Sequence, residues 1–270
     1  MLNERGARAT GAETFPTREQ LAETDVLILH KQEAGNIEPA ERVVLNEFLA
    51  RGGGVVVIHA GIVSRDPDWF KTIVGGAWRN GTARWLEGPM HLYFTDPESP
   101  ITRDASNWEM DDEIYWDLEM MPDVRILASA YTPKAAGARN VGFQRRAEEL
   151  TSRGRRIGVY DIQPQMWTYE RTVDGGKSPY RAFVAIPGHM YENFNRPNFR
   201  AILLRGITWA AGRSNLDELV KKEELGDALR YPDGGPVHPS KAAATSDRLK
   251  SGWTSRRSVA FDGCVGPSLM

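Results

Sequence analysis

Gly54-Val-Val-Val-Ile58 is a run of mostly β-branched residues without polar alternation, which is typical of a parallel strand that is covered on both faces. A second apolar run, Asp25-Val-Leu-Ile-Leu-His30, precedes it. Between the two runs, residues 38–51 show helical spacing of apolar side chains, with Pro39 suited to the first turn and Gly52 to the end. Strand, helix and strand in succession form a βαβ unit. This unit predicts an α/β fold in which helices flank a mostly parallel sheet.

The rest of the chain contains further periodic segments. Helices are expected at 66–74, 195–211 and 216–229, the last of them highly charged. Strands are expected at 91–95 and 124–131, together with a strand pair at 156–162 and 180–186. The polar stretch at 133–155 is expected to form an exposed excursion. We therefore expect an N-terminal extension at 1–20, one domain at 21–230 and a tail at 231–270.

Composition excludes several classes of protein. A net charge of -2 gives no electrostatic reason to expect a nucleic acid or an anionic membrane as partner. No run approaches the roughly 18 apolar residues of a membrane span, and the first residues lack the apolar core of a signal peptide, so a cytoplasmic protein is expected. The single cysteine, Cys264, excludes an internal disulfide and a thiolate metal cluster. The expected partner is a small-molecule substrate, and association into a homo-oligomer is left open.

Familiar motifs for other chemistries are absent. The run Gly52-Gly53-Gly54 precedes a strand instead of joining a strand to a helix, so no nucleotide cofactor is expected. No GxSxG elbow is present, and Cys264 has no histidine near it in the sequence, which argues against a serine or cysteine triad.

Histidines mark the ends of the predicted strands. His30 and His59 end the two strands of the βαβ unit, and His189 follows the strand expected at 180–186. Ligands bind at the carboxyl ends of strands in open α/β sheets, and imidazole suits both acid–base work and metal ligation. A histidine at a strand end can also be a structural residue. We take His59 and His189 as the stronger catalytic candidates.

An acidic stretch, Glu109-Met-Asp-Asp-Glu-Ile-Tyr115, supplies candidate partners for these histidines. Glu113 is expected to join the catalytic group, and Asp112 is a candidate metal ligand together with His91. A mixed set of histidine and carboxylate ligands suits zinc, whereas a carboxylate-rich set suits calcium, so the choice of a divalent metal stays open. The stretch could also be a solvated acidic loop.

Aromatic residues could line a cleft that binds a sugar, because aromatic faces pack on carbohydrate rings. The candidates are Trp116, Trp167, Tyr169 and Tyr191. Core packing explains such residues about as well.

Several segments resemble the ThuA-like (trehalose utilisation) family. They are Gly52–Ala60, the stretch from Ser99 to Tyr115, Gln165–Tyr169, Ile186–His189 and the stretch from Pro197 to Ala211. The resemblance implies a flavodoxin-like, class I glutamine amidotransferase-like sheet and a role in carbohydrate metabolism. It also implies that His59, His91, Glu113 and His189 match the family's recurring polar residues. Met1–Pro16 does not resemble the opening strand of relatives, so we allow for a sheet that lacks its first strand.

The resemblance does not carry over amidotransferase chemistry, because His59 stands where amidotransferases place their nucleophilic cysteine. The expected function is a hydrolase that acts on a C–O bond of a sugar derivative or small oxygen-rich metabolite, by acid–base or metal-assisted attack of water. Three alternatives remain: a metal-dependent lactone or ester hydrolase, a non-catalytic carbohydrate-binding domain, and a keto-sugar isomerase.

Overall fold

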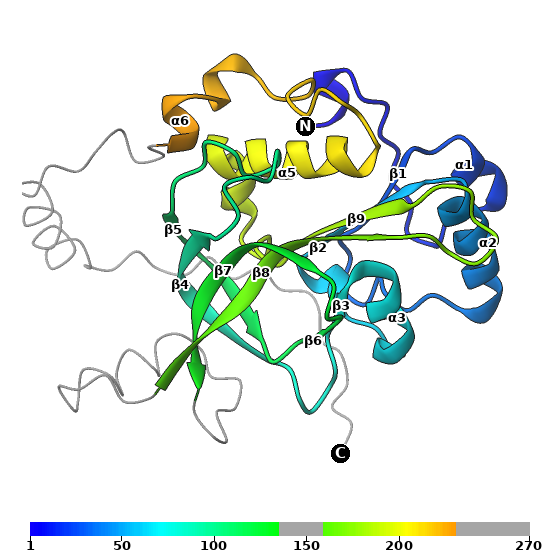
Figure 1. Ribbon diagram of the computed structural model, residues 1–270, viewed down its shortest axis with the longest axis horizontal. Coiled ribbons are helices and arrows are strands. Elements are labelled where there is room, and N and C mark those ends of the chain that lie inside the picture. The colour runs from blue at the N-terminus through cyan, green and yellow to red at the C-terminus, as the bar shows by residue number, and fades with distance from the viewer. Residues whose placement is uncertain (135–158, 231–270) are drawn as a thin grey trace, which may run out of the picture. The chain divides into compact units, whose positions relative to one another are not determined.

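One seven-stranded sheet, in the order β1-β2-β9-β8-β7-β4-β5, organises the computed structural model, which describes residues 1–134 and 159–230 (Figure 1). Its strands are β1 (Val26–Leu29), β2 (Gly54–Ile58), β4 (Arg84–Phe94), β5 (Trp108–Trp116), β7 (Arg125–Lys134), β8 (Val159–Arg171) and β9 (Tyr180–Ala185). A small second sheet pairs β3 (Gly76–Ala77) with β6 (Glu119–Met120).

Helices connect and cover these strands. The α-helices are α1 (Arg18–Ala22), α2 (Pro39–Ala50), α3 (Pro67–Val74), α5 (Pro197–Ala210) and α6 (Asp227–Arg230). Short 3-10 helices are η1 (Asn3–Arg5), η2 (His59–Ile62), η3 (Tyr191–Asn195) and η4 (Lys222–Glu224). Among the described residues, every helix is too short or too polar to cross a membrane.

The strand directions confirm the α/β class and refine the expected pairing. β1, β2 and β9 are parallel neighbours, as the βαβ unit predicts. The pairs β9–β8, β8–β7, β7–β4 and β4–β5 are antiparallel. Five of the seven strands therefore run in one direction, with β8 and β4 opposed. Short connections such as the one between β8 and β9 favour antiparallel neighbours, which explains the change of pairing at β9.

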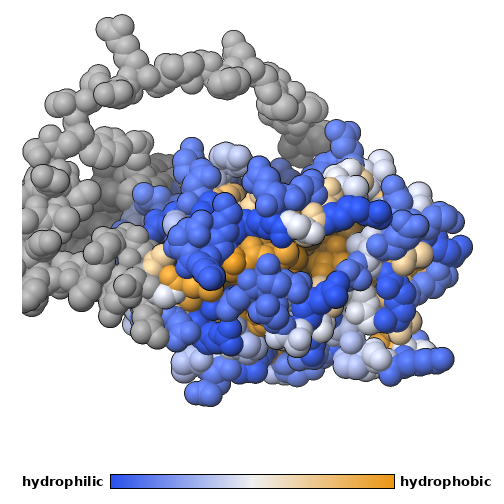
Figure 2. Space-filling view, turned by 90° about the horizontal axis from the view of Figure 1, so that it is seen from above, coloured by the Kyte–Doolittle hydropathy of each residue, from blue (hydrophilic) through white to orange (hydrophobic). Residues whose placement is uncertain are grey.

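The sheet carries an apolar core on each face, with α5 on one side and α3 on the other in Figure 1. On the α5 side, Phe199, Ile202 and Leu203 are buried against Phe183 and other sheet residues. Pro197 begins this helix, as the sequence predicts. In the view from above, the described residues leave only a narrow apolar band between hydrophilic margins (Figure 2).

Two predicted elements are wrong. The helix expected at 216–229 is replaced by the short η4 and α6, because Glu224 turns inward to bind Arg5 and Arg200 and Gly226 adopts φ 62°. The strand pair is also shifted: β8 extends to Arg171, and its part from Met166 onward pairs with β9. The segment before it pairs with β7 instead. The excursion expected at 133–155, apart from residues 133 and 134, and the tail expected at 231–270 lie outside the described residues.

Candidate functional site

Three of the predicted site residues lie together at the carboxyl ends of β2 and β9. His59 directly follows β2, His189 follows β9 across a short loop, and Glu113 lies on β5. One nitrogen or oxygen atom from each of the three side chains lies within 4.8 Å of the others. Among the described residues, this is the group of histidine and carboxylate side chains that could hold a metal ion. Parallel strands end at the same edge of a sheet, which explains why the two histidines meet.

The His59 ring is held in a defined orientation. Its Nδ1 lies 3.0 Å from the carbonyl oxygen of Ile186, and because a carbonyl only accepts, Nδ1 carries the proton in the neutral ring. Its Nε2 then faces the Tyr115 hydroxyl at 3.1 Å and Glu113 Oε2 at 3.2 Å. The backbone of His59 adopts φ 51°, an uncommon conformation for a residue with a side chain, and strain of this kind gathers at functional sites.

Glu113 is a buried carboxylate whose charge is stabilised locally. Burial alone would raise its pKa, but the hydrogen bond with His59 and the positive charges of His189 and His59 outweigh burial, so the pKa lies below its ordinary value. Burial and the neighbouring Glu113 raise the pKa of Tyr115 well above its ordinary value. Tyr115 therefore stays protonated and can donate its hydrogen bond to His59 or Glu113.

His189 is the most accessible member of the group, with 40% of its side chain exposed. Its Nδ1 lies 3.7 Å from Glu113 Oε1, and its Nε2 lies 3.6 Å from Glu87 Oε1. Glu87 and Glu113 are direct neighbours across β4 and β5. Two like charges in such a pair repel each other, and the His189 ring lies within 4 Å of both carboxylates. His189 is more exposed than Glu113 and His59, whose side chains are 10% and 8% exposed.

His30, the third strand-end histidine, lies beside the group without joining it. Its Nε2 is 3.5 Å from the carbonyl oxygen of Gly188, and its ring meets Phe194 edge-on at 5.7 Å. These contacts fit a structural residue.

The two residues predicted as metal ligands lie outside the cluster. His91 pairs with Glu109 on the solvent-exposed part of β4 and β5, at 3.0 Å, with 58% of its side chain exposed. Asp112 is fully buried and accepts hydrogen bonds from the backbone of Gly188 and His189. Asp112 lies outside the cluster because side chains alternate along β5, so that Asp112 and Glu113 point to opposite faces of the strand.

Three of the four aromatic residues predicted to bind a sugar are buried in the core. Trp116, Trp167 and Tyr169 expose 4%, 0% and 1% of their surface. The indole nitrogen of Trp167 donates to the carbonyl of Val74, so the polar end of this ring is also used internally. These residues are core residues and cannot reach a ligand. Tyr191 is 77% exposed and remains available.

Sequence reasoning missed three residues around the cluster, namely Tyr115, Glu87 and Asn193. Strand alternation could have placed Tyr115 on the same face as Glu113, because the two lie two residues apart. The signal for Glu87 and Asn193 was weaker, because their roles depend on the β4–β5 register and on the fold of η3.

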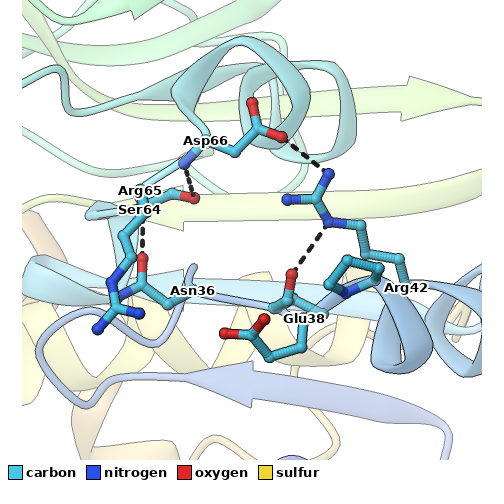
Figure 3. Close-up of a pocket in the computed structure, with 8 residues that line it drawn as sticks. Asn36, Glu38, Arg42, Ser64, Arg65 and Asp66 are labelled. Atoms are coloured by element: carbon cyan, nitrogen blue, oxygen red, sulfur yellow. Dashed lines mark hydrogen bonds and ion pairs between the residues drawn. The ribbon is translucent and has the colours of Figure 1, made fainter.

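A pocket of about 180 Å³ lies elsewhere on the same carboxyl-edge side, between the loops that follow β1 and β2 (Figure 3). Several of the polar groups that line it already bind one another. Arg42 pairs with Asp66, and the Ser64 hydroxyl accepts from the backbone of Asp66. None of its lining residues belongs to the cluster of His59, Glu113 and His189.

Comparison with known proteins agrees with this fold. A family model described as ThuA, trehalose utilisation, matches residues 3–210. A solved ThuA-like structure from Bacteroides uniformis ATCC 8492 is 22% identical, with a TM-score of 0.50 and coverage of 73% of this chain and 72% of that chain. Another from Parabacteroides merdae ATCC 43184 is 21% identical, with a TM-score of 0.52 and coverage of 72% of both chains. No curated protein matches the sequence. The chain therefore belongs to the ThuA family, whose description as trehalose utilisation points to a sugar-related role.

Proposed function

We propose that the protein is a hydrolase that acts on a C–O bond of a sugar derivative or another small oxygen-rich molecule. The observation that carries this proposal is the buried His59–Glu113 pair with the half-exposed His189 beside it. The sugar-related role of the family supports the substrate class. Of the aromatic candidates, only Tyr191 is exposed enough to contact the substrate.

In the acid–base form of the reaction, His59 Nε2 removes a proton from water, and the oxygen of that water forms a bond to the substrate carbon. Glu113 lies 3.2 Å from Nε2 and stabilises the resulting imidazolium. The C–O bond breaks as His189 donates a proton to the departing oxygen. A later proton transfer through solvent returns both histidines to their starting states. General acid–base catalysis of this kind contributes about 10²–10⁴-fold.

A metal-dependent lactone or ester hydrolase is the second candidate, because the same three side chains form a ligand set. Two imidazole nitrogens and one carboxylate oxygen are typical of zinc, whereas calcium prefers six to eight oxygens. The Nδ1–H group of His59 also donates a hydrogen bond to a backbone carbonyl, as the second ring nitrogen of a metal-bound histidine commonly does. A bound zinc ion would polarise the substrate carbonyl and lower the pKa of a bound water.

The test compares His59→Ala and His189→Ala with the matched control His91→Ala, in which an exposed histidine outside the cluster is removed. Each protein is assayed on a panel of glycosides and sugar lactones, with and without chelator, and its metal content is measured. We expect both cluster variants to lose at least about 100-fold in turnover, with the control unchanged. The hydrolase assignment is wrong if both cluster variants keep full turnover.

Three further outcomes separate the alternatives. Chelator-sensitive release of acid from lactones would favour the metal-dependent form. Saturable sugar binding without product, over long incubation, would identify a carbohydrate-binding domain. Incorporation of solvent deuterium into recovered keto-sugar would identify an isomerase.

A further inference from the structure

The Asp112 carboxylate is the most completely hydrogen-bonded acid near the cluster, and it is fully buried. Oδ1 accepts from the backbone nitrogens of Glu113 at 2.8 Å and His189 at 2.9 Å. Oδ2 accepts from the backbone nitrogen of Gly188 at 3.0 Å and from Asn193 Nδ2 at 2.7 Å. A carboxylate offers about four lone-pair positions, and all four are used here. Asp112 therefore has no acceptor position left for a metal ion or a substrate.

The four donors come from two separate parts of the chain. Glu113 belongs to β5, whereas Gly188, His189 and Asn193 belong to the loop and 3-10 helix between β9 and α5. Asp112 thus joins these two segments by three hydrogen bonds, and Asn193 Nδ2 also donates to the backbone carbonyl of Asp111. They are also the segments that carry the carboxylate and the accessible histidine of the cluster.

The position of His189 depends on this joint. The polar contacts of its ring, with Glu87 and Glu113, are long at 3.6 and 3.7 Å, and the ring meets His59 edge-on with 5.2 Å between the ring centroids. Contacts of that length hold a ring weakly, because hydrogen bonds weaken beyond about 3.2 Å. The close contact of this residue is the one from its backbone nitrogen to Asp112.

We propose that Asp112 is a positioning residue of the cluster, which sets the separation between Glu113 and His189 by binding the backbone of both. Only the reason why this separation matters, which is catalysis at the cluster, rests on the proposed function. Asp112 does not touch the reacting atoms and acts through the two residues that it holds.

The chemistry of the joint makes asparagine a poor replacement for Asp112. An asparagine side chain would present an NH₂ group to two of the four donors, so two N–H groups would face another donor. The variant Asp112→Asn keeps the size of the side chain, but only one of its two terminal groups can still accept hydrogen bonds. Asp111→Asn is the matched control, because Asp111 is the exposed neighbour on the same strand.

The experiment measures the affinity of the purified protein for Co²⁺ by calorimetric titration and determines the crystal structure of each variant. Asp112→Asn is expected to bind Co²⁺ about 10- to 100-fold more weakly and to show a longer distance from His189 to Glu113. Asp111→Asn is expected to match the wild type in both readouts. Leu45→Ala, in α2, serves as a second control that lowers stability away from the cluster.

A purely structural role would make Asp112→Asn resemble Leu45→Ala, with a lower melting temperature but unchanged Co²⁺ affinity. An unchanged His189–Glu113 distance in the crystal structure would overturn the proposal, even if the wild type binds no Co²⁺. Should Asp112→Asn fail to fold, Asn193→Ala removes one donor of the four and is read in the same way. A displaced His189 in a protein that hydrolyses no substrate would refute the proposed function and leave the positioning role intact.

Discussion

Replacing Glu113 by glutamine tests the electrostatics of the cluster directly. The carboxylate has only 10% of its side chain exposed, and Oε2 lies 3.2 Å from His59 Nε2. Glutamine keeps one acceptor oxygen but replaces the other with an NH₂ group and loses the charge, so one charge-assisted hydrogen bond, such as the one donated by Tyr115, is lost. Such a bond contributes about 1.5–3 kcal/mol, and we expect Glu113→Gln to lower the free energy of unfolding by about 2 kcal/mol at pH 6.

The pH dependence of this difference follows from the direction of the pKa shift. The pKa of Glu113 in the folded protein lies below its ordinary value of 4.5. Ionised Glu113 therefore stabilises the fold above the unfolded-state pKa, and this contribution is lost as the pH falls through the folded-state pKa. The gap in free energy of unfolding between the wild type and Glu113→Gln should be full near pH 6 and should shrink on acidification below the ordinary pKa.

Urea unfolding followed by circular dichroism, at several pH values between 6 and 3, measures the gap. Glu109→Gln is the matched control, because Glu109 lies on the same strand with 53% of its side chain exposed. Its substitution should change stability by less than about 0.5 kcal/mol at any of these pH values. A gap for Glu113→Gln that stays constant from pH 6 to pH 3, or a variant more stable than the wild type at pH 6, would refute the reasoning.

Three further substitutions test other parts of the fold. Gly188→Ala should cost about 2–4 kcal/mol in urea unfolding, because Gly188 adopts φ 144° and an added Cβ would lie 2.7 Å from Ile58; an unchanged midpoint would contradict this. Trp167→Phe should lower the melting temperature while leaving turnover unchanged, because Trp167 is a core residue; a selective loss of turnover would instead indicate contact with substrate. Glu224→Ala should cost about 3–5 kcal/mol, because it leaves the buried guanidinium of Arg5 unpaired; a loss below about 1 kcal/mol would show that the pair is solvated.

Local patterns were sufficient for the parts of the fold that depend on local physics. The apolar run at β2 and the helix that precedes it predicted the βαβ unit. Burial on both faces of a strand and the apolar spacing of a helix can each be recognised from residues that are close together in the sequence. The meeting of His59 and His189 followed from the expectation of a parallel sheet, since both residues come after the carboxyl ends of strands that are parallel neighbours.

Long-range contacts explain what the sequence did not reveal. Glu224 resembles a surface residue of a charged helix, yet its partner Arg5 lies 219 residues away and draws it into the interior. An aromatic residue such as Trp167 or Tyr169 looks the same in the sequence whether it binds a sugar or fills the core. Only the packing of β8 decides between the two roles. The position of Asp112 likewise depends on a loop that follows β9.

The hydrogen bond from His59 to Ile186 spans 127 residues, and this has a consequence for how the protein is made. During synthesis the chain emerges from its amino end, so β2 and His59 leave the ribosome long before β9 exists. Contacts between distant residues also form slowly, because the intervening loop must first be closed. The cluster can therefore be assembled only late in biogenesis. A nascent or truncated chain that ends before β9 carries His59 and Glu113 but lacks His189, so the three side chains of the cluster cannot meet in it.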